Sequence, residues 1–145
     1  MKVAIVKPFK ALRYDLKKAG APAGALVCPP YDVIDAAMQD ALYNKSAFNV
    51  VRVEYGKTTP EDKAGSDRYS RAAETFKSWI AQNILSTEAK PAFYLYEQTF
   101  DIASGGASRS HVVTRRGIFG ACKLEPFGTG CVFAHEETFG GPKAD

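Results

Sequence analysis

Two strand-like runs in the second half of the sequence predict a long β-hairpin. Residues 93–102 are aromatic, with Phe93, Tyr94, Tyr96 and Phe100, and residues 111–124 form a second strand-like run. The flexible segment 104–108, Ser-Gly-Gly-Ala-Ser, lies between them. Strand-like runs joined by a short glycine-containing segment are typical of a hairpin. Whatever else the chain forms, its fold must therefore contain antiparallel β-structure.

Charged residues in the middle of the second run suggest a cross-strand ion pair. Arg115 and Arg116 are adjacent, so one of them must face the inner side of an alternating strand. We expect one of the two to pair with Glu97 or Glu125.

An amphipathic helix is predicted upstream of the hairpin. Ser66 or Asp67 can cap it, and it should end near Gln82. Trp79 lies next to its apolar face and is expected to pack. The apolar positions follow the spacing i, i+3, i+4, i+7 and i+11: Tyr69, Ala72, Ala73, Phe76 and Ile80.

The remaining elements are shorter. Asp35 is predicted to cap a helix that runs to about Tyr43. The β-branched residues of Asn49–Tyr55 predict a strand, and the polar segment 56–65 a loop. Further short strands are expected at residues 3–6, where the strand should be buried, at 25–28 within the loop 19–31, and at 131–134.

This order of elements predicts an α+β (mixed α/β) fold, in which a β-sheet with a long antiparallel hairpin is packed by two helices. With 145 residues, a single domain over residues 1–145 is expected. Apolar residues make up 46% of the chain and charged residues 24%, which is typical of a globular protein.

Charge, hydropathy and cysteine usage exclude several classes. The net charge of +3 is too small to favour nucleic-acid binding. No apolar run approaches the roughly 18–20 residues that span a bilayer, and the apolar run at the N-terminus is too short for a signal peptide. We therefore expect a cytoplasmic protein. Cys28, Cys122 and Cys131 form no CxxC motif, so they are expected to be small, buried or half-buried thiols.

The segment Pro29-Pro30-Tyr31-Asp32-Val33 is the first candidate site. Two prolines stiffen the backbone, so Tyr31 and Asp32 would be presented at fixed angles. The alternative is a rigid connector in which Tyr31 packs and Asp32 caps the next helix.

The segment His135-Glu136-Glu137-Thr138 is the second candidate. Imidazole can transfer a proton or bind a metal or phosphate, and Glu136 can activate a hydroxyl or hold Mg²⁺. The zincin motif is absent, because no second histidine follows one turn later. Lys143 lies in a glycine-rich segment that could reach a ligand anion, although a plain turn is the simpler interpretation. A solvated polar loop is the alternative for the whole region.

Taken together, the motifs resemble the domain-of-unknown-function family DUF1015. The resemblance spans essentially the whole chain, and the Pro-Pro-Tyr-Asp-Val and His-Glu-x-Thr segments are its most specific parts. It is carried by residues 7–12, 29–33, 49–54, 69–85, 94–98, 116–119, 135–138 and 142–143.

The resemblance implies that this chain is the N-terminal segment of a longer protein. The family carries a downstream Gly-His-His-Arg motif, similar to that of free-serine kinases with a ParB/sulfiredoxin-like fold, and some members are thought to phosphorylate free L-serine with ATP. This sequence contains no His-His pair. An arginine that usually follows Pro-Lys-x-Asp in the family is also missing. Catalysis by this chain alone is therefore in doubt.

Carried over residue by residue, the resemblance places six side chains at the family's pocket. The family does not assign their individual roles; our hypothesis is that Asp32, His135 and Glu136 are catalytic, with Asp32 or Glu136 as base or Mg²⁺ ligand. No metal site is assigned beyond that. The residues expected to contact nucleotide or phosphate are Tyr31, Thr138 and Lys143, together with His135.

Two functions from different classes follow. The first is the N-terminal segment of a kinase that uses ATP and Mg²⁺ on a small-molecule substrate, free L-serine. The second is a non-catalytic regulatory module that binds a nucleotide or a partner. A truncation product without activity is a third possibility. Neither the acceptor substrate nor the oligomeric state follows from the sequence.

Overall fold

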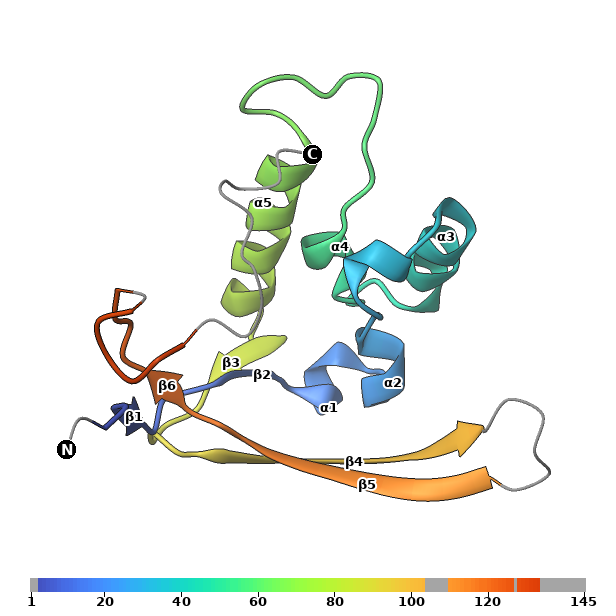
Figure 1. The fold of residues 1–145 in the computed structure, drawn as a ribbon. Coiled ribbons are helices and arrows are strands. Elements are labelled where there is room, and N and C mark those ends of the chain that lie inside the picture. The colour runs from blue at the N-terminus through green and yellow to red at the C-terminus, as the bar shows by residue number, and fades with distance from the viewer. Residues whose placement is uncertain (1–2, 104–109, 127, 134–145) are drawn as a thin grey trace. The chain divides into compact units, whose positions relative to one another are not determined.

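A computed structural model describes residues 3–103, 110–126 and 128–133, and these form two compact units (Figure 1). One unit contains residues 12–88, and the other contains the described parts of residues 1–11 and 89–145. Helices and antiparallel strands are mixed along the chain, which confirms the predicted α+β class. In the described ranges, no helix is long and apolar enough to cross a membrane.

The unit of residues 12–88 is mainly helical. Its strands β2 (Leu12–Tyr14) and β3 (Leu85–Thr87) pair antiparallel, with Leu12 opposite Thr87 and Tyr14 opposite Leu85. Its elements are β2 (Leu12–Tyr14), α1 (Leu16–Ala19), α2 (Ala23–Leu26), the one-turn 3-10 helix η1 (Tyr31–Val33), α3 (Ala36–Lys45), α4 (Val51–Glu54), α5 (Arg68–Ala81) and β3 (Leu85–Thr87).

The two longest helices begin at the predicted caps. The Asp35 carboxylate accepts a hydrogen bond from Met38 N at 2.7 Å and caps α3. Asp67, one of the two expected candidates, caps α5: its carboxylate accepts from Tyr69 N and Ser70 N, and Asp67 N donates to Ser70 Oγ. This reciprocal arrangement satisfies backbone donors that a helix start leaves unpaired.

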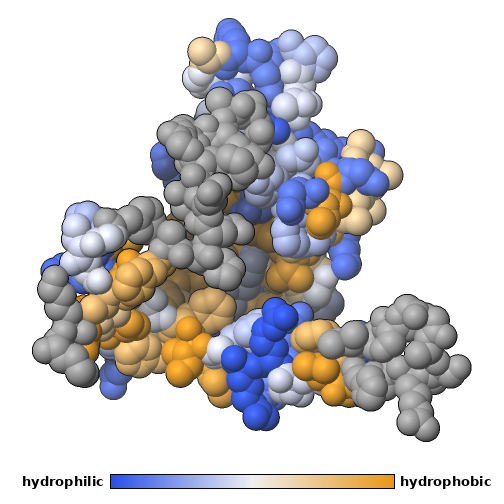
Figure 2. Space-filling model, viewed as in Figure 1, coloured by the Kyte–Doolittle hydropathy of each residue, from blue (hydrophilic) through white to orange (hydrophobic). Residues whose placement is uncertain are grey.

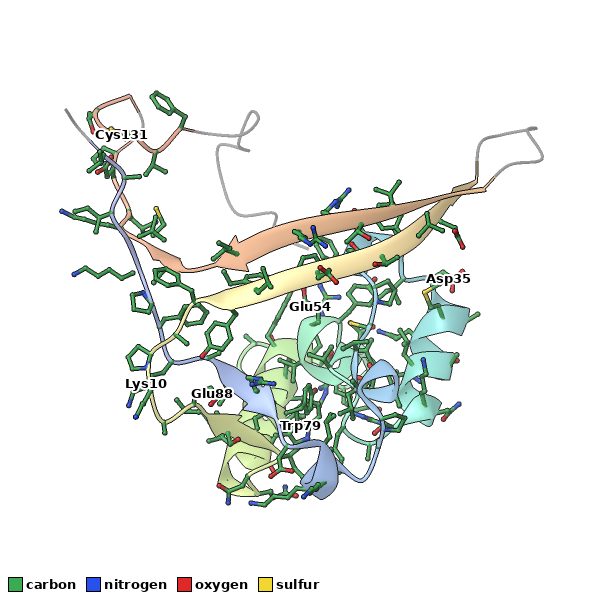
Figure 3. The ribbon with its side chains drawn as sticks, turned by 90° about the horizontal axis from the view of Figure 1, so that it is seen from below. Lys10, Asp35, Glu54, Trp79, Glu88 and Cys131 are labelled. Carbon is green, nitrogen blue, oxygen red and sulfur yellow. The ribbon has the colours of Figure 1, made fainter. Side chains whose placement is uncertain are left out.

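The core of this unit consists of two clusters of buried apolar side chains. Trp79 is 4% exposed and points from α5 into the centre of the unit, where the rings of Tyr14 and Phe48 each lie 6.0 Å away (Figure 3). The packing of Trp79 is thus confirmed. The buried members of the first cluster are Ala19, Leu26, Trp79, Ile84 and Leu85, and those of the second are Ile34, Leu42 and Val51.

Helix α5 packs through a slightly different face from the one that its apolar spacing indicates. Tyr69 is 58% exposed and Ile80 41%, whereas Trp79 is buried. The indole is the largest apolar group available on this helix. Its burial turns the predicted stripe partly toward solvent.

The predicted strand at Asn49–Tyr55 is wrong, because Val51–Glu54 forms helix α4. Val51 is fully buried against Ile34 and Leu42, and Asn49 Oδ1 accepts a hydrogen bond from Val51 N at 3.0 Å. Burial and this local turn outweigh the β-propensity of the valines, which is strongly dependent on context.

Three shorter predicted strands also differ from the structure. Residues 23–26 form helix α2, which starts after Pro22, instead of a strand at 25–28. Only Val6 of the predicted buried strand 3–6 is paired, and it is 51% exposed. Residues 131–133 form no strand, and residue 134 lies outside the described ranges. Short apolar runs are ambiguous when judged by pattern alone.

The other unit is built on the predicted hairpin. Strand β4 (Tyr94–Ala103) pairs antiparallel with β5 (Ser110–Phe119), with Tyr94 opposite Phe119. Arg116 Nε donates to Glu97 Oε2 at 2.7 Å, so the expected cross-strand ion pair is confirmed. Strands β1 (Val6–Lys7) and β6 (Ala121–Cys122) form a second antiparallel pair.

Part of the hairpin's surface is hydrophobic. Leu95 and Ile118 lie opposite each other in the register, and each is 73% exposed. Figure 2 shows hydrophobic side chains interspersed with hydrophilic ones on the visible face of the molecule. These apolar side chains of the hairpin are exposed, whereas the unit of residues 12–88 buries apolar side chains in its core.

Candidate functional site

The Tyr31–Asp32 segment forms a rigid turn, as its two prolines predict. Val33 N donates to Pro30 O and Ile34 N to Tyr31 O, both at 3.2 Å, which closes the one-turn helix η1. Ile34, immediately after this turn, is 7% exposed and is packed in the second core cluster. The backbone of the turn is therefore anchored to the core.

The side chains of this turn point away from the core. Tyr31 is 42% exposed, so it does not pack as the alternative interpretation requires. Asp32 is exposed, and the helix cap that it could have supplied is supplied by Asp35. Within the described ranges, no hydrogen bond or ion pair engages the Asp32 carboxylate. This carboxylate is thus available to a ligand.

The second candidate region contains the other four predicted site residues. His135, Glu136, Thr138 and Lys143 lie outside the described residues. The six predicted site residues are therefore represented in the structure by Tyr31 and Asp32. In the part of the chain that the structure describes, no group of three or more His, Cys, Asp or Glu side chains could hold a metal ion.

Two of the three cysteines have the burial that the sequence predicts. Cys28 and Cys131 are half-buried, and Cys122 is exposed. Burial, with a smaller contribution from the negative charge of Glu54, raises the pKa of the Cys28 thiol. A raised pKa disfavours the reactive thiolate, so Cys28 fits a packing role beside the second core cluster.

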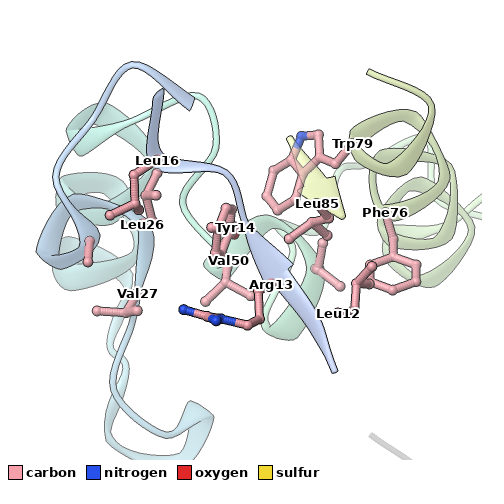
Figure 4. A pocket seen from close by; sticks show the side chains of 12 residues that line it. Leu12, Arg13, Tyr14, Leu16, Leu26, Val27, Val50, Phe76, Trp79 and Leu85 are labelled. Atoms are coloured by element: carbon pink, nitrogen blue, oxygen red, sulfur yellow. The ribbon is translucent and has the colours of Figure 1, made fainter. Parts of the chain in front are cut away.

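The unit of residues 12–88 also contains an apolar cavity of about 490 Å³, which no sequence motif indicates (Figure 4). Arg13 is the one charged residue among the described residues that line it. Burial raises the pKa of Tyr14, on its wall, to about 12, and the Tyr14 hydroxyl donates to Phe48 O at 2.9 Å. The lining also includes Leu12, Leu16, Ala23, Leu26, Val27, Val50, Val53, Phe76, Trp79 and Leu85. These residues come from separate elements, so no single motif predicts the cavity.

A second pocket, which we call the basic pocket, lies in the same unit and has a volume of about 220 Å³. Among the described residues that line it, four side chains are cationic and none is acidic. Helices α4 and α5 and the segment between them supply most of the lining. The lining residues are Tyr43, Arg52, Gly56, Lys57, Thr59, Arg68, Arg71 and Thr75.

Comparison with known families accounts for the motifs. The family model DUF1015, described as a protein of unknown function, matches residues 6–145. This chain belongs to the DUF1015 family. The match confirms the resemblance inferred from the Pro-Pro-Tyr-Asp-Val and His-Glu-x-Thr segments. No curated protein and no solved structure matches the chain.

In this DUF1015 chain, the described residues offer two kinds of chemistry. The Asp32 carboxylate is a hard oxygen ligand or proton acceptor on a fixed turn, and the basic pocket is suited to an anion. Mg²⁺ is usually held by one or two carboxylates together with the phosphates of a substrate. Asp32 supplies one carboxylate of this kind on the described part of the chain.

Proposed function

We propose that this chain forms the N-terminal part of an ATP-dependent kinase that phosphorylates free L-serine. The observation that carries the proposal is the exposed Asp32 carboxylate on a turn anchored between Pro30 and the buried Ile34. Membership of the DUF1015 family supports it, because the family resemblance implies a downstream Gly-His-His-Arg motif similar to that of free-serine kinases. Because ATP and free serine are cytoplasmic metabolites, we assign the activity to the cytoplasm.

In the proposed reaction, the serine hydroxyl oxygen forms a bond to the γ-phosphorus of ATP while the bond from that phosphorus to ADP breaks. Asp32 or Glu136 takes the hydroxyl proton or holds Mg²⁺. His135, Thr138 and Lys143 contact the phosphates, and Tyr31 borders the nucleotide. Mg²⁺ would neutralise phosphate charge when bound. Phosphoryl transfer depends mainly on such positioning and charge stabilisation.

The test is an Asp32→Asn substitution in a longer form of the protein that includes the family's downstream Gly-His-His-Arg motif. We call this form the extended chain. Formation of ADP and O-phosphoserine is measured with Mg²⁺-ATP and L-serine. We expect turnover to fall by about a hundredfold or more, as the loss of a proton acceptor or metal ligand requires. The matched control is Asp35→Asn, which removes a negative charge three residues away and preserves a good helix cap. Unchanged turnover in Asp32→Asn would remove Asp32 from the mechanism.

A non-catalytic nucleotide- or partner-binding regulatory module is the second candidate. Two pockets described in the unit of residues 12–88 favour it, since they offer binding surfaces for a small molecule. A thermal melt followed by Trp79 fluorescence, with and without Mg²⁺-ATP, separates the two functions. A ligand that binds the folded form raises the Tm. A raised Tm in the extended chain without formation of ADP supports the module.

A further inference from the structure

The basic pocket concentrates positive charge in a small space. Arg52, Lys57, Arg68 and Arg71 line it. Pockets for drug-sized ligands typically measure about 300–1,000 Å³, whereas this one measures about 220 Å³. Its size and charge suit a compact anionic group.

One of the four cations holds the pocket together. Arg71 Nη1 and Nη2 donate to the two carboxylate oxygens of Asp62 at 2.6 and 3.0 Å, and Nη2 also donates to Lys57 O at 2.8 Å. Asp67 lies close enough to add to the negative potential at Arg71. Arg71 therefore ties the loop before α5 to the helix and has little capacity for a ligand.

Two other cations share one aromatic ring. The guanidinium carbon of Arg52 lies 4.2 Å from the centre of the Tyr43 ring, and Lys57 Nζ lies 4.8 Å from the same centre. Arg52 Nη2 donates to Tyr43 O at 2.8 Å. The ring holds both cations at the pocket, and the hydrogen bond further orients Arg52.

Among the described residues, no carboxylate pairs with Arg52. Lys57 pairs with Asp40. Arg52, in contrast, forms no ion pair within the described ranges, and its buried Nε has no hydrogen-bond partner there. A partly buried positive charge beside other cations is costly unless an anion offsets it. The arrangement is that of a site prepared for an anion.

We propose that the basic pocket binds the phosphate group of a small molecule. Arg52, Lys57 and Arg68 are the charged contacts, and the hydroxyls of Thr59 and Thr75 are further donors. Arginine is suited to this role because its planar fork matches the geometry of phosphate oxygens. Arg68 is oriented by Tyr69, whose hydroxyl accepts from Arg68 Nη2 at 2.7 Å. The proposal concerns binding and does not depend on the kinase reaction at Asp32.

The experiment titrates the whole chain with millimolar inorganic phosphate at constant ionic strength and follows the Tm. Acetate replaces phosphate in a parallel series. We expect phosphate, but not acetate, to raise the Tm in a saturable way. Lys57→Gln and Arg68→Gln are each expected to weaken the apparent affinity about tenfold, as loss of a hydrogen bond from a charged group does. Asp40→Asn, which removes the carboxylate beside Lys57, should strengthen it.

The matched control is Lys77→Gln, which removes a positive charge from an exposed position of helix α5, the helix that also contains Arg68. Its phosphate response should equal that of the original chain. Phosphate also stabilises proteins generally by exclusion from their surfaces. Equal responses of Lys57→Gln, Arg68→Gln and Lys77→Gln would show that general effect and overturn the proposal, as would an equal response to acetate.

Two further ligands identify the source of the phosphate group. ATP without Mg²⁺ and adenosine are titrated in the same way. A shift with inorganic phosphate and ATP but none with adenosine supports a site for the phosphate group itself. Shifts with ATP and adenosine but none with inorganic phosphate would place recognition on the nucleoside and contradict the proposal.

Discussion

At the scale of single residues, Asn49 explains more of the fold than its place in the sequence suggests. It is fully buried, and its side chain makes three hydrogen bonds. Nδ2 donates to Ala25 O at 2.9 Å and to Val27 O at 3.0 Å, and Oδ1 accepts from Val51 N. One amide thus joins the end of α2 to the start of α4, between the two core clusters.

Replacement of Asn49 should be strongly destabilising. Asn49→Ala leaves two carbonyl oxygens and one N–H without a partner, and each buried unsatisfied group costs about 1–3 kcal/mol. We expect the free energy of unfolding to fall by about 3 kcal/mol, measured by urea denaturation. Asn44→Ala, at an exposed position of α3, is the control and should change stability little. Equal stability of the two variants would show that the Asn49 amide is not a structural link.

At the scale of elements, the structure agrees with the predictions that rest on local sequence signals. It differs where an element depends on contacts between residues far apart in the sequence. Asp35, Asp67 and the hairpin turn segment are recognisable in a short window, and α3, α5 and the hairpin form where they were predicted. The valines at 50–53 have the wrong local preference. Their helical form follows from contacts with residues far away in sequence, which a single-sequence pattern does not contain.

The same division applies to the candidate site. The prolines before Tyr31 encode a stiff, exposed turn locally, and the structure contains it. The basic pocket combines Tyr43 of α3 with Arg52 of α4 and Arg71 of α5, so its charges are scattered in the sequence and gather only on folding. The low net charge of the chain gave no indication of that local concentration.

Two carboxylates near the N-terminal end of α5, Asp62 and Asp67, make the stability of the protein depend on pH in the acid range. Hydrogen bonds from Arg71 hold the pKa of the Asp62 carboxyl well below its usual range, and backbone N–H donors, Ser70 N foremost, lower the pKa of Asp67. A carboxyl whose pKa is lowered by folding stabilises the protein above its unfolded pKa of about 3.9. This stabilisation is lost as the pH falls through the folded pKa.

We therefore expect Asp62→Asn to flatten the dependence of stability on pH below about pH 4. The urea midpoint is measured from pH 7 to pH 2 for the original chain and the variant. Asp62→Asn should have a lower midpoint at pH 7 and a smaller decrease toward pH 2. Glu61→Gln, at the exposed neighbouring position, provides the control. An unaltered acid slope in Asp62→Asn would contradict the link between this ion pair and acid stability.

At the scale of the whole molecule, the buried side chains are unevenly distributed. In the described ranges, the fully or nearly fully buried residues, from Ala19 to Leu85, all lie in the unit of residues 12–88. The other unit is held by strand pairing and by ring contacts such as Phe9 with Tyr94, whose centres are 5.2 Å apart. Gly120 allows close approach there, since a Cβ would lie 2.8 Å from Val6 Cγ1.

This distribution predicts that the two units differ in resistance to local opening. A two-stranded hairpin is at best marginally stable without a buried face, and opening free energies follow buried contacts and protected hydrogen bonds. In hydrogen exchange, Val50 N, bonded to Leu26 O, and Ile84 N, bonded to Trp79 O, should exchange only with global unfolding. Amides of β4 and β5 should exchange faster by about a hundredfold or more.

The comparison is made by mass spectrometry on peptides from residues 48–55 and 78–86 against peptides from 94–103 and 110–119. Asn49→Ala serves as an internal test, because it weakens the core of residues 12–88. It should speed exchange in the first two peptides and leave the hairpin peptides nearly unchanged, since their opening does not require that core to unfold. Hairpin amides protected as strongly as Ile84 N would show instead that β4 and β5 open only with the whole molecule. A buried face would then have to cover Leu95 and Ile118.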